Sequence, residues 1–262
     1  MTRIRQIDAF TSVPFKGNPA GVCILEAPAD AAWMQSVAAE MNVAETAFIW
    51  PEGDAFRLRW FTPATEVELC GHATLASAHA LWESGTLSDG QQAVFNTLSG
   101  RLTAVREGDW IVLDFPVESS RETLDTDAIS AAIGTDVLAA CCNRFDFLAE
   151  VASAAQVRDL EPDLRAISAL DCRGLIVTAT SDDARYDFVS RFFGPAVGVD
   201  EDPVTGSAHC FLGPYWADRL GRTELTGYQA SARGGVVNVA LHGDRVRLKG
   251  QAVTVLVGEL TG

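Results

Sequence analysis

The sequence has few positive charges. Its 20 lysines and arginines stand against 35 aspartates and glutamates, which gives a formal net charge of -15. Because no basic patch offsets the repulsion from phosphate, this composition argues against a generic nucleic-acid or anionic-membrane surface. We therefore expect a small-molecule or protein partner, with no nucleic acid and no membrane.

The sequence also lacks long apolar runs. None approaches the roughly 18 to 20 residues that cross a bilayer, and no charged start is followed by an apolar signal segment. We expect a cytoplasmic protein. The six cysteines have irregular spacing, which favours reduced thiols over a disulfide framework. Neither CxxC pairs nor an HExxH motif occur, so we expect no metal site.

Short apolar runs are the most frequent pattern in the sequence. IRQIDAF, AGVCIL and WIVLDFP are rich in β-branched residues and are bounded by glycine, aspartate or proline, which predicts strands. Helices are expected at 31–41 and 73–82, the second because it has no glycine or proline and many alanines and leucines. The pattern predicts an α+β protein with few helices.

Two segments about half the chain apart resemble each other. RWFTPATEVELCGHATLASAHALW at 59–82 and RFFGPAVGVDEDPVTGSAHCFLGPYWA at 191–217 each run from an aromatic pair through a proline and an acidic turn to a Gly-X-Ala triplet. This predicts two similar domains related by pseudo-twofold symmetry, each a mainly antiparallel, barrel-like sheet around a central helix. The expected domains are 1–117, completed by a strand at 251–262, and 118–250, with a polar linker at 114–125.

Both triplets are expected to begin helices at a cleft between the domains. The first turn of a helix carries unpaired N–H groups and a partial positive charge, and therefore suits a carboxylate. Side chains at these places are candidates for chemistry, although His72 also fits a surface helix start, Asp202 a turn cap and Glu45 a solvated strand edge. The loop 15–18 fits either a cleft lining or a simple hairpin turn.

Five motifs carry a resemblance to a known family. NPAGVCIL, NVAETAF, FTPATEVELCGHATLASAHAL, RFFGPAVGVDEDPVTGSAHC and ARGGVVNVAL resemble the phenazine-biosynthesis isomerase-like (PhzF-like) family of the diaminopimelate-epimerase-like superfamily, in the expected order from about residue 7 to 260. The resemblance implies a homodimer and a cofactor-independent isomerase. In the best understood member a glutamate moves a proton between ring carbons of a dihydro-hydroxyanthranilate. Carried onto this sequence, the catalytic positions are Glu45, His72 and Asp202, and the substrate-binding positions are Gly71, Gly206 and Ser207.

Three functions remain open at this point. The favoured one is an isomerase that moves a proton on a small, carboxylate-bearing and possibly cyclic substrate, with Glu45 as acid and base. A racemase or epimerase would need a cysteine before both triplets, and Cys70 is matched by Thr205, whose hydroxyl is too weak an acid. A variant of this idea is a thiol-dependent enzyme that uses Cys70 alone. The third is a binding protein without turnover on the same scaffold.

Overall fold

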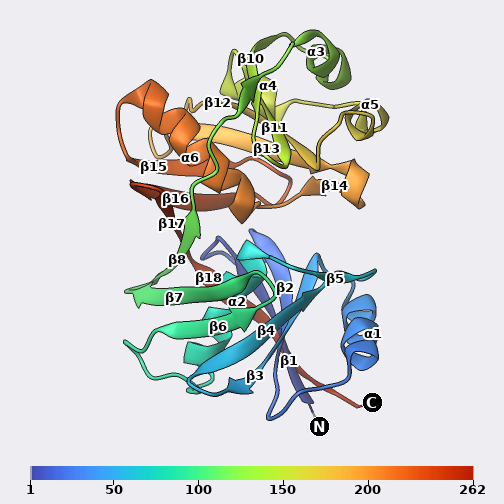
Figure 1. Cartoon of the computed structure of the whole chain (residues 1–262), viewed down its shortest axis with the longest axis vertical. Helices are drawn as coiled ribbons and strands as arrows, with labels where there is room; N and C mark the ends of the chain where they lie inside the picture. The colour runs from blue at the N-terminus through green and yellow to red at the C-terminus, as the bar shows by residue number, and fades with distance from the viewer. Residues whose placement is uncertain (1, 262) are drawn as a thin grey trace. The chain divides into compact units, whose positions relative to one another are not determined.

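The computed structural model describes residues 2–261, which divide into two compact units. The first unit comprises Met1–Asp114 and Lys249–Gly262, and the second comprises Phe115–Leu248. The chain crosses from one unit to the other twice, within β8 (Trp110–Pro116) and within β17 (Arg245–Gly250). Figure 1 shows the helices and strands of both units.

The first unit contains a sheet and two helices. Its further strands are β1 (Thr2–Ala9), β2 (Asn18–Ile24), β3 (Glu45–Glu52), β4 (Ala55–Phe61), β5 (Glu66–Val67), β6 (Ala93–Thr97), β7 (Gly100–Glu107) and β18 (Ala252–Leu260), and its helices are α1 (Ala31–Met41) and α2 (Gly71–Glu83). Strand β1 pairs antiparallel with both β2 and β18. The pairs β2–β3 and β4–β6 are parallel, whereas β3–β4, β4–β5, β6–β7 and β7–β8 are antiparallel.

Helix α2 is the centre of the first unit. It packs against β1, β2 and β3, and each side chain from His72 to Ala78 is buried. A helix that is buried on all sides needs small and apolar residues around its whole circumference, which the segment HATLASA supplies. By contrast, α1 packs mainly on β3 and β4 and exposes one face.

The second unit repeats this arrangement with different lengths. Its further strands are β9 (Glu122–Thr123), β10 (Val137–Cys142), β11 (Asp146–Val151), β12 (Gly174–Thr180), β13 (Phe188–Gly194), β14 (Val199–Asp202), β15 (Glu224–Gln229) and β16 (Gly235–His242). Its helices are α3 (Asp127–Ile133), α4 (Ala154–Arg158), α5 (Leu164–Ser168), α6 (Gly206–Leu220) and the 3-10 turn η1 (Pro195–Val197). The pairs β11–β12 and β13–β15 are parallel, and the pairs β9–β10, β10–β11, β12–β13, β13–β14 and β15–β16 are antiparallel.

Helix α6 is the buried helix of the second unit, and it tolerates an internal proline. Pro214 has no N–H to give to the carbonyl of Cys210, one turn earlier. That carbonyl instead accepts a hydrogen bond of 3.1 Å from the N–H of Glu118. Trp216 stacks on Phe188 with ring centroids 6.0 Å apart, which anchors the helix to β13.

The α+β class, with two similar units that each hold a mainly antiparallel sheet and a buried helix, is confirmed. Both predicted helices are present, and the second begins two residues earlier than expected. The short helices α3, α4 and α5 were not predicted from the sequence. Within residues 2–261, no helix combines the length and hydrophobicity that crossing a bilayer requires.

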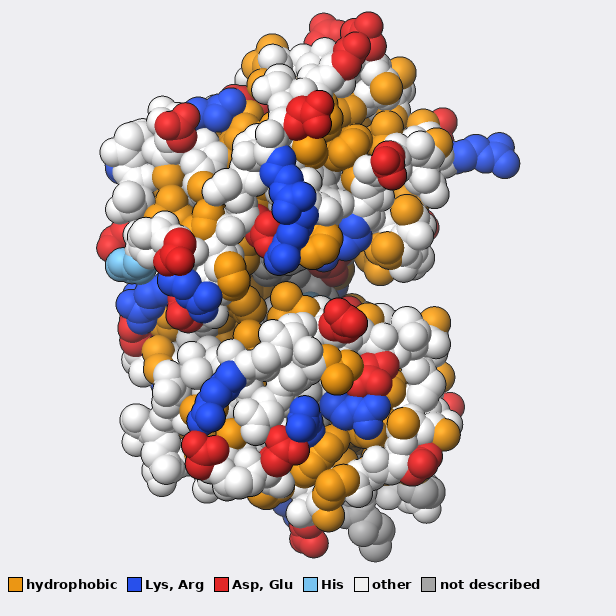
Figure 2. All heavy atoms as spheres, in the orientation of Figure 1, with side chains coloured by type: hydrophobic (Ala, Val, Ile, Leu, Met, Phe, Trp, Pro, Cys, Tyr) orange, Lys and Arg blue, Asp and Glu red, His pale blue; other side chains and the backbone are white. Residues whose placement is uncertain are grey.

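The charged side chains are mixed on the surface. On the face in Figure 2, lysine and arginine side chains lie beside aspartates and glutamates and form no continuous basic patch. In the first unit, for example, Arg101 pairs with Asp54 and Arg106 with Asp89, each at 2.9 Å.

A glycine closes the hairpin that leads into β2. Gly17 has a φ of +65°, and a Cβ added to it would lie 2.1 Å from the carbonyl oxygen of Ala9. Gly53 has nearly the same φ, +64°, with no atom within 4 Å of its Cβ position. We expect Gly53→Ala to cost about 1 kcal/mol for its backbone conformation and Gly17→Ala to cost about 1–3 kcal/mol more for the steric overlap. Urea unfolding of both variants measures the difference, and equal losses would contradict it.

Candidate active site

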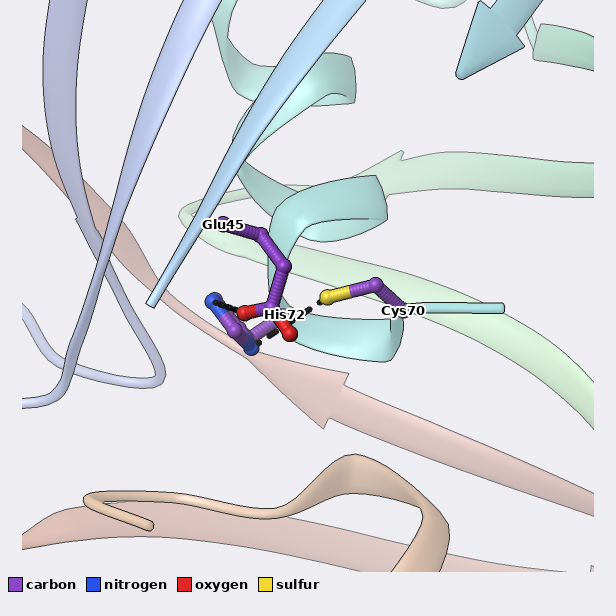
Figure 3. A group of neighbouring side chains, drawn as sticks. All are labelled: Glu45, Cys70 and His72. Atoms are coloured by element: carbon purple, nitrogen blue, oxygen red, sulfur yellow. Dashed lines mark hydrogen bonds and ion pairs between the residues drawn. The ribbon is translucent and has the colours of Figure 1, made fainter. Parts of the chain in front are cut away.

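Three segments bring side chains together at one end of the first unit's sheet. Glu45 is the first residue of β3 and pairs in register with Ala20 of the parallel strand β2, which begins at Asn18. Helix α2 packs against both strands and begins at Gly71. Glu45 and His72 therefore meet, with Cys70 beside them (Figure 3).

The histidine is held through its Nδ1 atom. The side-chain amide Nδ2 of Asn18 lies 3.2 Å from His72 Nδ1, and Cys70 Sγ lies 3.5 Å from the same nitrogen. An amide nitrogen only donates, so Nδ1 is the acceptor and the ring proton is assigned to Nε2. Asn18 is fully buried and His72 is 5% exposed, so their contact is shielded from solvent.

The other ring nitrogen faces the carboxylate. His72 Nε2 lies 3.2 Å from Glu45 Oε2, within ion-pair distance. The angle is nevertheless not that of a hydrogen bond, and among residues 2–261 this buried Nε2 has no hydrogen-bond partner. Leaving a buried donor in that state costs about 1–3 kcal/mol. A substrate atom that accepts from Nε2 would recover this energy.

Burial keeps the imidazole neutral. Desolvation lowers the pKa of His72 to about 3, and the backbone carbonyl of Pro19, which accepts a hydrogen bond from the protonated ring, opposes this shift. At neutral pH the ring is therefore a hydrogen-bond donor without charge beside a carboxylate. This combination is suited to proton transfer at a carbon acid, because the histidine does not neutralise the base.

The start of α2 adds an electrostatic contribution. Cys70 is the N-cap residue, with extended backbone angles of φ -145° and ψ 112°, and its side chain makes no capping hydrogen bond. The partial positive charge of the helix start, next to Gly71, therefore favours an anionic group of a ligand.

The same three side chains are possible metal ligands. One ligand atom from each of Glu45, Cys70 and His72 can be chosen so that all lie within 4.8 Å of one another. Sequence spacing did not suggest this group, because Glu45 comes from a separate strand.

In the second unit, Asp202 is tied to the start of α6. Its Oδ2 accepts a hydrogen bond of 2.5 Å from the hydroxyl of Thr205. Gln229 completes the contact: its Oε1 accepts from the Thr205 N–H at 2.9 Å and its Nε2 donates to the Asp202 carbonyl at 2.7 Å. Thr205, which stands where a second catalytic cysteine would be needed, thus already donates its hydroxyl proton to Asp202.

Ser207, in the first turn of α6, accepts a hydrogen bond of 3.0 Å from Arg173 Nη2. Arg173 is itself held by two hydrogen bonds to Asp146, at 2.8 and 2.5 Å, and Asp146 is 1% exposed. Burial raises the pKa of Asp146, while the hydrogen bonds from Arg173 lower it. Because Ser207 accepts from an arginine, its hydroxyl proton is available for an anionic ligand.

Of the predicted residues, the structure brings together Glu45, His72 and the helix start at Gly71. Asp202, Gly206 and Ser207 lie in the second unit, and their catalytic and binding roles stay predictions. Sequence reasoning left the role of Asn18 open and missed Arg173, since a lone arginine before a strand has no distinctive pattern.

Asn18 should set the tautomer of His72. Asn18→Ala removes the donor to Nδ1, whereas Asn18→Asp puts an acceptor there and should move the ring proton from Nε2 to Nδ1. The imidazole 15N chemical shifts report which nitrogen is protonated. We expect the Nε2–H form in the wild type and the Nδ1–H form in Asn18→Asp. The same tautomer in both would show that Asn18 does not control it.

Comparisons with known proteins match this chain to one family over nearly its whole length. Residues 7–258 match the family described as phenazine biosynthesis-like protein, PhzC-PhzF. An uncharacterized isomerase of Halalkalibacterium halodurans is 53% identical over 260 residues, which cover 99% of this chain and 98% of that protein. The crystal structure of a PhzF-family phenazine biosynthesis protein from Enterococcus faecalis superimposes with a TM-score of 0.93 at 40% identity, and covers 99% of this chain and 98% of that one.

A more distant structure shares the fold alone. A probable proline racemase from Agrobacterium radiobacter K84 is 12% identical with a TM-score of 0.66, and the match covers 100% of this chain and 93% of that one. The resemblance drawn from the motifs and the epimerase-like fold are both confirmed.

Proposed function

Since this chain belongs to the phenazine biosynthesis-like PhzC-PhzF family and is an isomerase, we propose that Glu45 moves the proton in its reaction. The substrate is a small molecule with a carboxylate, on a cyclic or an open-chain skeleton. Glu45 removes a proton from a carbon atom and returns it to another position, and no cofactor takes part.

The observation that carries this proposal is the contact between Glu45 and His72. The carboxylate lies 3.2 Å from a neutral, buried imidazole whose Nε2–H has no hydrogen-bond partner within the described chain. A negative charge that develops on the substrate when its proton leaves would be stabilised by a hydrogen bond from Nε2. Glu45 and His72 thus have complementary tasks, as base and as donor.

The two-thiol racemase is disfavoured by the chemistry of Thr205. A racemase of that kind needs one thiolate and one thiol, but Thr205 has a hydroxyl that is donated to Asp202. Cys70 alone cannot act on both faces of a carbon atom. We assign it no proton-transfer role.

A panel of small aromatic and cyclic carboxylates tests the proposal against a binding protein. Ligands that raise the melting temperature of the wild type are then incubated with it in D2O, and deuterium at carbon is followed by NMR. The proposal predicts enzyme-dependent exchange for at least one ligand. Binding without exchange across the whole panel would favour a binding protein instead.

The remaining assignments are predictions for later tests. Asp202 is proposed as a second catalytic residue, and Ser207 with the helix starts at Gly71 and Gly206 as binding groups for the substrate's carboxylate. Homodimer assembly and a cytoplasmic location also stay predictions.

A further inference from the structure

The proposed proton transfer gives Cys70 no role. It is 7% exposed, makes no capping hydrogen bond as N-cap residue, and lies with its sulfur 3.5 Å from His72 Nδ1. A buried thiol, an imidazole and a carboxylate next to one another form a typical donor set for thiophilic divalent cations.

The distance between sulfur and nitrogen fits a metal bound to both. Zinc bonds of about 2.3 Å to sulfur and about 2.0–2.1 Å to nitrogen, at a tetrahedral angle, place the two ligand atoms about 3.5 Å apart. The observed Sγ–Nδ1 distance is 3.5 Å. Nδ1 is also the nitrogen without a proton, because Asn18 donates to it, so its lone pair is available as a ligand once the amide turns aside.

The third ligand needs only a side-chain movement. One ligand atom each of Glu45, Cys70 and His72 can be chosen within 4.8 Å of one another, but Glu45 Oε2 lies beside Nε2 (3.2 Å), whereas a zinc bound to Nδ1 and Cys70 requires separations of about 3.3–3.6 Å. The Glu45 side chain is 19% exposed and turns about several single bonds, so it can move from Nε2 toward a cation bound to Nδ1 and Cys70. Solvent or a ligand carboxylate would take the fourth position.

We infer that Glu45, Cys70 and His72 form a binding site for Zn2+ or a related thiophilic cation, and that the bound cation prevents Glu45 from acting as a base. Binding forms a metal–sulfur bond and releases the thiol proton to the buffer. The thiolate and the carboxylate then balance the two positive charges of the metal. These two full charges outweigh the partial positive charge of about half a unit at the start of α2.

Cadmium titration tests the binding part without any substrate. Cd2+ bound to a thiolate has an ultraviolet charge-transfer band, which should saturate at one equivalent in the wild type and be lost in Cys70→Ser. Cys142→Ser is the matched control and should keep the band, because consecutive residues Cys141 and Cys142 in β10 point to opposite faces and cannot chelate together. A full band in Cys70→Ser, or no saturable band in the wild type, would overturn the assignment.

The inhibitory part rests on the proposed function and has its own test. Zn2+ should stop deuterium exchange by the wild type, whereas Cys70→Ser should keep its exchange and need at least tenfold more Zn2+ for the same inhibition. Stoichiometric Cd2+ binding with exchange unaffected by Zn2+ would overturn the inhibitory part. If the metal-free wild type catalyses no exchange, the proposed function fails, while the cadmium band still decides the metal site.

Discussion

Glu45→Gln is expected to slow the isomerisation by about 100- to 10,000-fold, the contribution typical of a positioned general base. Glutamine keeps the shape of the side chain and its place next to His72 but cannot take up a proton. Substrate affinity should change much less, because Glu45 is proposed to act on the reacting proton. Steady-state kinetics with a substrate from the carboxylate panel separate the two effects.

A control separates loss of the base from loss of a negative charge. Glu40 is an exposed residue of α1, so Glu40→Gln removes the same charge at a distance from His72. We expect wild-type rates for this variant. A drop of less than tenfold for Glu45→Gln, with unfolding midpoints equal to the wild type, would show that another group carries the proton.

Arg173→Met is expected to destabilise the second unit by about 3 kcal/mol. It leaves the carboxylate of Asp146, which is 1% exposed, without its two hydrogen bonds from the guanidinium. Breaking a buried ion pair from one side typically costs about 3–5 kcal/mol, and the lower end applies because Arg173 keeps 35% of its side chain exposed. Denaturant unfolding measures the loss.

The pH dependence of this loss identifies its cause. Without Arg173, burial and the charge of Glu118 both raise the pKa of Asp146, so its pKa in the folded state lies above that in the unfolded state. The protonated form is then favoured in the folded protein, so the deficit should shrink as the pH falls and grow as it rises. Arg158→Met, which breaks the exposed pair with Asp182, should have little effect at any pH. A similar loss in both variants would contradict the account.

The sequence was sufficient for the fold and for proposing Glu45, His72 and the helix start at Gly71 as site candidates, but not for their contacts. The repeated Gly-X-Ala triplet predicted two similar units, because a glycine followed by small and apolar residues is a local sequence feature that indicates the start of a buried helix. The motif containing Glu45 resembled a known family, and Glu45 lies next to His72 because α2 packs on the parallel, in-register strands β2 and β3. That register depends on long-range pairing, which no local pattern encodes.

Two contacts, Asn18 with His72 and Arg173 with Ser207, could not be predicted from the sequence for the same reason. Asn18 follows a turn in the sequence, and its amide reaches His72 because it begins β2, against which α2 packs. Arg173 reaches Ser207 because Asp146 fixes its guanidinium, and Asp146 begins a strand that pairs with the one after Arg173. Both effects need the folded chain.

The central claim is that Glu45 carries the proton. Its most direct test is deuterium exchange, measured in parallel on metal-free wild type, Glu45→Gln and Cys70→Ser. A substrate that binds to all three is incubated in D2O, and incorporation at carbon is followed by NMR. The account predicts exchange by the wild type and Cys70→Ser and almost none by Glu45→Gln. Exchange that persists in Glu45→Gln and disappears in Cys70→Ser would contradict it, and would assign the proton transfer to the thiol.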